Sequence, residues 1–365
     1  MTLWRYILRG FLRAVLAVFA VIALVIVLFT SVENLRRFGE TGAGSGDVVR
    51  VTLLQAPEVL YQVFPLVLML ASLITFLRFA RTSELVVMRA SGISALRLIA
   101  VPVVAALLFG VGFVAVVNPF VAASIRRGQA MVDDFDRDGA SLLSFSKEGV
   151  WLRQGDPDGQ TVIQAARTNA DGTVLSGVTM HRFDAEGTLY SRIEAPQARL
   201  TRGAWILPNA IEWRLEADGS FNRTTAYSGR LDLPTTLTSE EILESFAPPE
   251  TVGFWDLGRF IAQMEESGFS GQRHRLFLQS ELAKPALFAA MVLIGAAFAL
   301  RPTRFGQTGV MILLAVLAGF ALYFLKDFAE SLGGRGQIPL MVAAWTPPVA
   351  AILLAVGLLL HLEDG

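Results

Sequence analysis

The sequence predicts a membrane protein of the α+β class, with six transmembrane helices and an all-β domain inserted after the third helix. The chain is 53% hydrophobic and 17% charged, and its mean hydropathy of +0.52 is too high for a soluble globular protein. Six apolar runs reach the length of about 20 residues that a helix needs to cross a bilayer. Between the third and fourth runs, segments rich in Val, Ile, Thr, Trp and Tyr alternate with turn signals, which is typical of β structure. These changes in composition divide the chain into three predicted regions, residues 1–118, 119–270 and 271–365.

The first three predicted spans cover residues 7–30, 59–77 and 95–117. Arginines precede the first span and no small-residue cleavage signature follows it, so we interpret it as a retained span rather than a removed signal peptide. Pro65 lies inside the second span and predicts a kink there. The third span is expected to end at Asn118-Pro119.

Residues 120–270 predict an all-β sandwich or open barrel, because strand-like segments recur about every ten residues. Acidic residue–glycine pairs, which favour tight turns, separate these segments. The pairs are Asp158-Gly159, Asp171-Gly172, Glu186-Gly187 and Asp218-Gly219. A helical segment at residues 256–266 is expected to lead back to the membrane.

The last three predicted spans cover residues 277–300, 309–328 and 340–360. Arginines are concentrated at the N-terminus, in the loop after the second span and in the loop after the fourth. They are Arg5, Arg9, Arg13, Arg78, Arg81, Arg89, Arg97, Arg301 and Arg304, whereas the short loops on the other side hold Arg36, Arg37, Arg50 and Arg335. The positive-inside rule therefore predicts both termini in the cytoplasm and the β domain outside, which in a bacterium is the periplasm.

A polar interruption between the second and third spans predicts a short cytoplasmic helix at about residues 82–92. Ser83 or Thr82 suits the N-cap, and Glu84 lies in the first turn, where the helix dipole favours an acid. Gly92 suits the C-terminal stop.

Helical spacing places Glu84, Met88 and Ser91 on one face of this short helix. An acid beside an exposed apolar side chain suits docking into a groove on a soluble partner. The alternative, given equal weight, is an ordinary amphipathic connector that lies on lipid.

The sequence lacks the usual signatures of catalysis and metal binding. It has no GxxxxGK[ST], HExxH or GxSxG motif and no cysteine, and His181, His274 and His361 lie far apart. Residues 134–139 open like a calcium loop, but its twelfth position is Phe145 rather than Glu. A net charge of −1 without a basic face argues against a nucleic-acid partner. We therefore expect no catalytic residue, no metal site and no cofactor, and a lipid- or glycan-modifying enzyme is the least favoured alternative.

Charges near the membrane edges are the candidate lipid-binding residues. Arg36 and Arg37 end the first span on the outer side, and Lys326 and Asp327 lie near the outer end of the fifth. Because arginine can form two hydrogen bonds to a phosphate, these residues suit a phosphorylated amphiphile from the outer leaflet. The alternative is that they anchor the helix ends at the interface, with Glu33 pairing to the arginines; this alternative is preferred for Lys326.

The order of spans and several motifs resemble the lipopolysaccharide-export permeases LptF and LptG over essentially the whole chain. The most specific motif is Ser-Glu-Leu-Val-Val-Met-Arg-Ala-Ser-Gly at residues 83–92. Two further features favour LptG. They are Ser-Leu-Leu at residues 141–143 ahead of Gly-Val-Trp at 149–151, and Ile-Pro-Leu at 338–340 ahead of Trp-Thr-Pro-Pro at 345–348.

The resemblance implies a permease subunit of an ABC-type exporter. Such a subunit takes lipopolysaccharide from the outer leaflet of the inner membrane and passes it to a periplasmic bridge. The implied partners are a second, LptF-like permease, an LptB-like ATPase dimer that supplies the energy, and LptC-like and LptA-like bridge proteins. The inserted domain would be of the jelly-roll type.

The resemblance also implies which residues act. The helix that docks on the ATPase would present Glu84, Leu85, Met88, Arg89, Ser91 and Gly92. Arg36, Arg37 and Lys326 would contact lipopolysaccharide, whereas Thr30 stands where the family often has a lysine, so one phosphate contact is not expected here. An efflux or lipoprotein-release permease of another family is the runner-up, but those usually place the large outer domain after the first span.

Overall fold

The structure is a computed structural model. It describes residues 2–38, 45–135, 143–146, 149–156, 159–168, 173–184, 187–201, 203–215, 221–226, 229–235, 237, 248–266, 270–300 and 308–364. The chain forms two compact units. The helical unit contains Met1–Phe135, Glu250–Leu257 and Gln272–Gly365, and the sheet unit contains Asp136–Pro249 and Gly258–Gly271.

The helical unit is built from long apolar helices and a few short connecting elements. They are α1 (Thr2–Phe38), α2 (Ser45–Arg81), α3 (Glu84–Ala90), α4 (Ala95–Gly112), the π-helix η1 (Phe113–Val117), α5 (Asn118–Phe135), the 3₁₀ turn η2 (Pro249–Thr251), the start of α7 (Phe254–Glu266), α8 (Gln272–Ala299), α9 (Thr308–Gly334) and α10 (Leu340–Asp364). Among the described residues, six helices are long and apolar enough to cross a membrane. The six spans predicted from hydropathy are thus confirmed.

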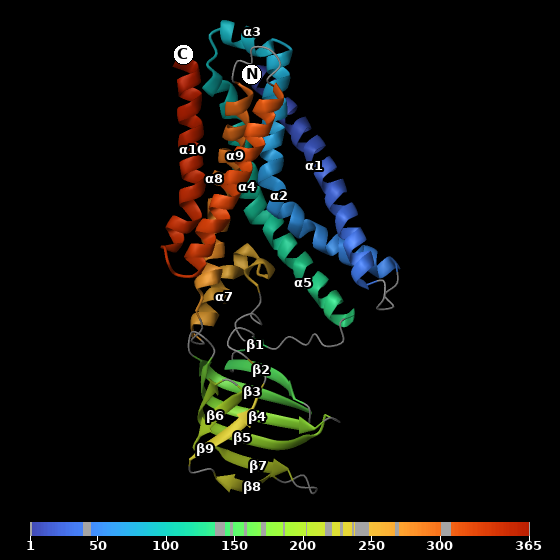
Figure 1. The fold of residues 1–365 in the computed structure, drawn as a ribbon, viewed down its shortest axis with the longest axis vertical. Coiled ribbons are helices and arrows are strands. Elements are labelled where there is room, and N and C mark those ends of the chain that lie inside the picture. Colours follow the sequence, from blue (N-terminus) through green and yellow to red (C-terminus); the bar gives the residue numbers. More distant parts are fainter. Residues whose placement is uncertain are drawn as a thin grey trace. The chain divides into compact units, whose positions relative to one another are not determined.

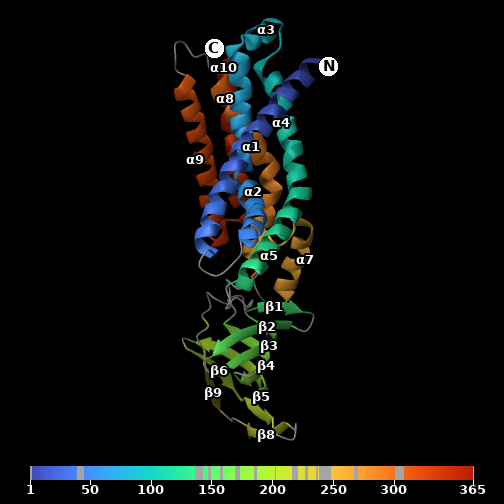
Figure 2. The same ribbon diagram turned by 90° about the vertical axis from the view of Figure 1, so that its right-hand side faces the viewer.

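Figures 1 and 2 both place the short helix α3 and the two chain termini at one end of the helical unit. The end of α1, the start of α2 and the end of α5 lie at the opposite end. The chain leaves the helical unit for the sheet unit after Phe135, returns for Glu250–Leu257, and returns finally at Gln272 after Gly258–Gly271. The loop carrying Arg301 and Arg304 lies outside the described residues.

The third span is longer than its sequence predicts. Instead of ending at Asn118-Pro119, the helix passes through η1 and continues as α5, and its apolar part covers Ala95–Gln129. Pro119 is tolerated because its missing N–H would have paired with the carbonyl of Ala115, and that carbonyl accepts a hydrogen bond from the Trp255 indole (2.9 Å). The expectation of a helix end was therefore wrong, for a reason that lies outside the local sequence.

Helices α2 and α8 form the centre of the helical unit. Small residues bring them close together: a Cβ at Gly295 of α8 would lie 2.4 Å from the carbonyl oxygen of Met69 in α2. The buried Ser72 hydroxyl donates to the carbonyl of Val292 across the same interface (2.8 Å). Large buried side chains such as Phe288 fill the space around this contact.

The sheet unit contains one antiparallel sheet whose strands branch at β5. Its strands are β1 (Leu143–Ser146), β2 (Gly149–Asp156), β3 (Gly159–Thr168), β4 (Val174–Asp184), β5 (Leu189–Thr201), β6 (Ala204–Pro208), β7 (Ile211–Leu215), β8 (Phe221–Ala226) and β9 (Arg230–Pro234). The main order is β1-β2-β3-β4-β5-β6-β9, and β7 pairs with both β5 and β8. The predicted fold class, membrane helices with an inserted antiparallel sheet, is confirmed.

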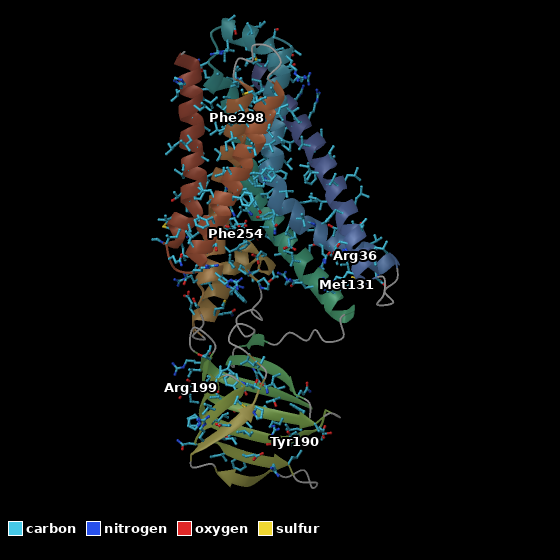
Figure 3. The ribbon with its side chains drawn as sticks, in the orientation of Figure 1. Arg36, Met131, Tyr190, Arg199, Phe254 and Phe298 are labelled. Carbon is cyan, nitrogen blue, oxygen red and sulfur yellow. The ribbon has the colours of Figure 1, made fainter. Side chains whose placement is uncertain are left out.

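Alternating side chains of the sheet bury one face. Trp205 is the largest buried side chain there, and its indole donates to Gln154 (3.3 Å), which also accepts from the Thr235 hydroxyl (2.8 Å). The predicted helical segment is present as α7, whose Phe260 and Met264 belong to the same apolar core. Tyr190 and Arg199, both on β5, are labelled in Figure 3.

Candidate coupling site and lipid-binding residues

The short helix α3 is held by two buried side chains. Leu85 and Met88 are each 8% exposed and join a core cluster that includes Phe79 of α2 and Leu98 of α4. Their spacing of three residues places both on the inward face. Met88 therefore attaches α3 to the helical unit and is not the exposed apolar companion of Glu84 that the sequence predicted.

The exposed apolar side chains of α3 are Val86 and Val87, at 65% and 67% exposure. Arg89 is also exposed. The sequence did not single out the two valines, because the exposed apolar residue was sought on the helical face that carries Glu84. The helix thus presents one acid, one base and two valines outward, a surface that can pack against and pair with a soluble protein.

Both ends of α3 have a defined backbone geometry. Ser83 precedes the helix in a left-handed conformation (φ 57°) and its side chain makes no capping hydrogen bond, so the predicted Ser83 cap is wrong. Gly92 has φ 85°, and its N–H donates to the carbonyl of Arg89 (3.0 Å) while the N–H of Ile93 donates to that of Met88 (3.3 Å). This pair of bonds is a Schellman motif, which confirms the predicted glycine stop. The Ser91 hydroxyl donates to the same Met88 carbonyl (2.7 Å).

The carboxylate of Glu84 is oriented from two sides. The Tyr6 hydroxyl of α1 donates to one oxygen (2.9 Å), and the Thr82 hydroxyl lies 3.0 Å from the other and 3.0 Å from the carbonyl of Arg78, with one hydrogen to share between them. The Tyr6 ring is itself fixed by stacking on Phe79, with 5.8 Å between ring centroids. Each carboxylate oxygen has a second lone pair, so Glu84 can still accept the paired hydrogen bonds of a guanidinium. Tyr6 lies 78 positions from Glu84, and no local sequence signal indicates this contact.

Arg36 and Arg37 lie in the last turn of α1 and are exposed (Figure 3 labels Arg36). This is the end of the helical unit opposite α3. The position of the turn is fixed by the neighbouring Asn34, which is 4% exposed and donates to Thr52 (3.1 Å) and Gln55 (2.9 Å) of α2. The two guanidinium groups are thus presented at the membrane edge by a firmly packed helix end.

The ammonium of Lys326 in α9 pairs with a carboxylate of its own chain. It donates to Glu330, one turn further on (2.6 Å), and the two side chains are 22% and 20% exposed. The other oxygen of Glu330 is buried and has no hydrogen-bond partner among the described residues. A phosphate that binds Lys326 would therefore compete with Glu330.

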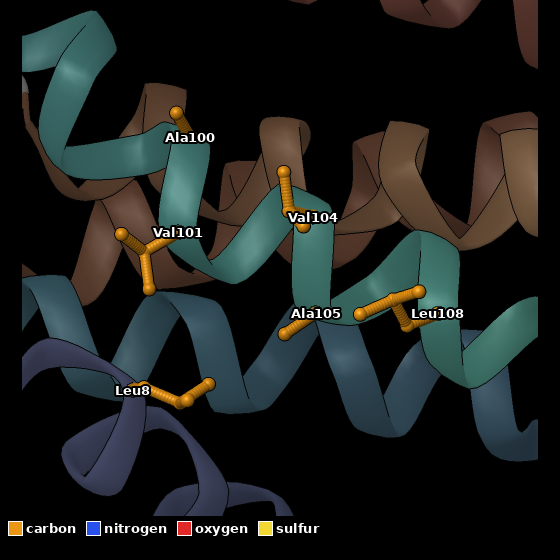
Figure 4. A pocket seen from close by; sticks show the side chains of 6 residues that line it. All are labelled: Leu8, Ala100, Val101, Val104, Ala105 and Leu108. Carbon is orange, nitrogen blue, oxygen red and sulfur yellow. The ribbon is translucent and has the colours of Figure 1, made fainter. Parts of the chain in front are cut away.

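An apolar cavity of about 340 Å³ lies between α1 and α4 (Figure 4). Its lining consists of Leu8, Ala100, Val101, Val104, Ala105 and Leu108. These side chains can accommodate hydrocarbon but offer no group that would orient a ligand. Within the described part of the chain, no three His, Asp or Glu side chains gather as a metal site. Most of the calcium-like loop at residues 134–139 lies outside the described residues.

Comparison with known proteins identifies relatives over the whole length. The family model described as "Lipopolysaccharide export system permease LptF/LptG" matches residues 5–361. The lipopolysaccharide export system permease protein LptG of Escherichia coli K12 is 25% identical over 359 residues, which cover 94% of this chain and 96% of that protein. The LptG protein of Haemophilus influenzae Rd is 25% identical over 378 residues, covering 100% of this chain and 99% of that protein.

Proposed function

Because the chain belongs to the family of lipopolysaccharide export system permeases LptF/LptG, we propose that it works as the LptG-type half of an ABC-type exporter. It is a permease subunit of the lipopolysaccharide export system and a multi-pass protein of the inner membrane. The other half is an LptF-type permease. The family match across residues 5–361 leaves the efflux and lipoprotein-release alternatives without support.

The exporter draws its energy from a separate ATPase dimer of the LptB type, and this chain performs no catalysis itself. The docking element is α3, with Glu84 as the acid that meets a basic group of the ATPase. Leu85 and Met88 pass a displacement of α3 on to α2 and α4, because they pack α3 against these two helices. Arg89 adds a second charge, and Ser91 with Gly92 ends the helix. The observation that carries this proposal is that Tyr6 and Thr82 hold both oxygens of Glu84 at the end that bears the termini.

Lipopolysaccharide is bound at the opposite end of the helical unit. Arg36 and Arg37 contact its phosphates, and Lys326 contributes a further contact when phosphate replaces Glu330. ATP-driven closure of the ATPase displaces α3 and narrows the space between the two permease halves. The lipid then moves to the sheet unit and onward to LptC-type and LptA-type bridge proteins. Rigid coupling at Glu84 is essential because only a contact that differs between two states can shift their equilibrium.

The test is charge reversal at the docking acid. We expect Glu84→Lys to insert and assemble with the second permease but to lose the ATPase on co-purification, because a lysine repels the basic group that Glu84 meets. Asp47→Lys, the same reversal in the first turn of α2, is the matched control and should retain the ATPase. A full complement of ATPase on the Glu84→Lys complex would refute the docking role.

A further inference from the structure

Three polar side chains form a cluster inside the membrane-spanning part of the helical unit. The Tyr61 hydroxyl of α2 donates to one oxygen of Glu281 in α8, and the Lys284 ammonium donates to the other (2.6 Å). The same ammonium lies 3.6 Å from the centroid of the Tyr61 ring. Glu281 is 2% exposed and the Lys284 side chain 12%. The cluster therefore joins α2 to α8 through two buried charges.

Burying an ion pair is costly, and well-packed apolar residues of the same volume often stabilise a protein as well or better. Ionisable groups within membrane helices are correspondingly uncommon and mark functional positions by default. Fold stability alone therefore gives no reason for this cluster. A role in fixing one conformation against another is the better explanation.

The helices are weakened at the residues that the cluster joins. Pro65 lies four residues after Tyr61 in α2, and Pro285 lies four residues after Glu281 in α8. A proline has no N–H, so the carbonyls of Tyr61 and Glu281 lose their usual partners in the helix. Each helix can therefore bend at the residue whose side chain enters the cluster. Figure 1 shows that α2 changes direction along its length.

The third helix packed at this level is also irregular. The π-helix η1 begins at Phe113, whose ring stacks on Tyr61 (4.9 Å between centroids) and meets Phe288 of α8 edge-on (5.4 Å). Gly110 of α4 touches Pro285 so closely that a Cβ there would lie 2.4 Å from the proline Cα. π-helical turns and prolines both interrupt the regular hydrogen-bond ladder. Three neighbouring helices are thus weakened where they touch one another.

The segment through which the chain re-enters the helical unit, around Phe254 and Trp255, contacts η1 and the start of α5. The N–H of Phe254 donates to the Asn118 side chain (2.8 Å), and the Trp255 indole donates to the carbonyl of Ala115 in η1 (2.9 Å; Figure 3 labels Phe254). Hydrogen bonds thus connect η1 and the start of α5 to the start of α7.

We propose that Tyr61, Glu281 and Lys284 are positioning residues that make α2, α4 and α8 bend together at one level, so that a displacement of α3 reaches the far ends of these helices. This inference rests on the proposed function. Without the cluster, the weakened helices would bend independently and the displacement would be absorbed within the membrane. Binding of the ATPase at α3 would be unaffected.

The experiment measures lipopolysaccharide released per ATP hydrolysed by the complete exporter in proteoliposomes. Tyr61→Phe removes one hydroxyl and keeps the ring stack, and the double variant Glu281→Gln/Lys284→Met removes both charges without leaving one unpaired. We expect both to retain the ATPase and its hydrolysis rate while release per ATP falls about fivefold or more, the range of typical coupling effects. The matched control is Ser72→Ala, which removes another buried α2–α8 hydrogen bond and should leave the ratio unchanged.

A second measurement separates coordinated bending from simple stabilisation. Because the chain contains 0 cysteines, spin labels can be placed at Ala90→Cys on α3, outside the residues assigned to docking, and at Val49→Cys on α2, two exposed positions. Nucleotide binding by the ATPase should change the distance between the labels in the otherwise native exporter, and Tyr61→Phe should reduce that change. An unaltered release ratio and distance change in Tyr61→Phe would overturn the inference, as would an equal loss in Ser72→Ala. Loss of the ATPase from the cluster variants would also overturn it, whereas loss from Glu84→Lys tests the docking role alone.

Discussion

At the scale of single residues, Glu84 illustrates how a distant side chain prepares a contact. A free carboxylate at a helix start samples several rotamers, and a partner must select one of them. Here Tyr6 reaches from α1 and Thr82 from the preceding turn, so both oxygens are already directed. Tyr6 thereby makes α1, the helix that also carries Arg36 and Arg37, part of the proposed docking site.

We expect Tyr6→Phe to weaken ATPase binding without altering assembly of the permease pair. The lost hydrogen bond is largely exposed, so the expected effect is about 1 kcal/mol, or roughly fivefold in Kd. Titration of the ATPase into the solubilised permease pair measures this change. Tyr190→Phe, on β5 of the sheet unit, serves as the control. A Kd equal to that of the unmodified protein would show that Tyr6 does not orient Glu84 for docking.

At the scale of elements, the strand β4 contains a titratable group whose environment opposes its charge. His181 lies opposite Arg192 of β5 and Val162 of β3 in the strand register. Partial burial is the main cause that lowers the pKa of His181 below its usual 6.5, and Arg192 lowers it further, while Glu194 acts in the opposite direction. The folded sheet therefore favours neutral His181.

This shift predicts a pH-dependent stability of the sheet unit. Between the lowered pKa and 6.5 the unfolded chain binds more protons than the folded one, so the contribution of His181 is complete above 6.5 and is lost as the pH falls. The urea midpoint, followed by tryptophan fluorescence, should thus be lower at about pH 5.5 than at about pH 7.5. His181→Gln should reduce this difference, whereas His361→Gln in α10 should not. A difference that persists unchanged in His181→Gln would contradict the assignment.

An element could be predicted when the residues that determine it lie close together in the sequence. Apolar run length is a local property, so all six spans and the helical segment α7 could be located from sequence. The continuation through Asn118-Pro119 could not, because it depends on Trp255, which is distant in the chain and supplies the missing donor. The same holds for the site: Glu84 lies in a specific motif, whereas Tyr6 has no local signal, and the inward orientation of Met88 depends on packing against α2 and α4.

At the scale of the whole molecule, an even number of spans places both termini on one side, and an insertion after the third span lies on the other. In the helical unit, α3 lies at the same end as the termini. This agrees with the positive-inside rule, which places both the arginine-rich N-terminus and the arginine-rich segment around α3 in the cytoplasm. Docking and export are therefore assigned to opposite faces of the membrane.

Labelling of single cysteines tests this topology directly, because the native chain has none. In cells with a permeabilised outer membrane, a membrane-impermeant maleimide should modify Thr188→Cys, an exposed position beside β5. It should modify Ala90→Cys, an exposed position of α3 outside the residues assigned to docking, only after the inner membrane is disrupted. Equal labelling of the two positions in intact inner membranes would exclude the proposed arrangement.

The pairing of Lys326 with Glu330 has a consequence for turnover. A bare ammonium near the bilayer would hold a phosphorylated lipid strongly, and each cycle would then stall at its departure. In the proposed lipid-binding role, the phosphate would exchange with Glu330 on arrival and on departure, and neither step would leave the Lys326 ammonium without an anion. Glu330 on α9 would thus favour rapid passage of the proposed cargo over tight retention.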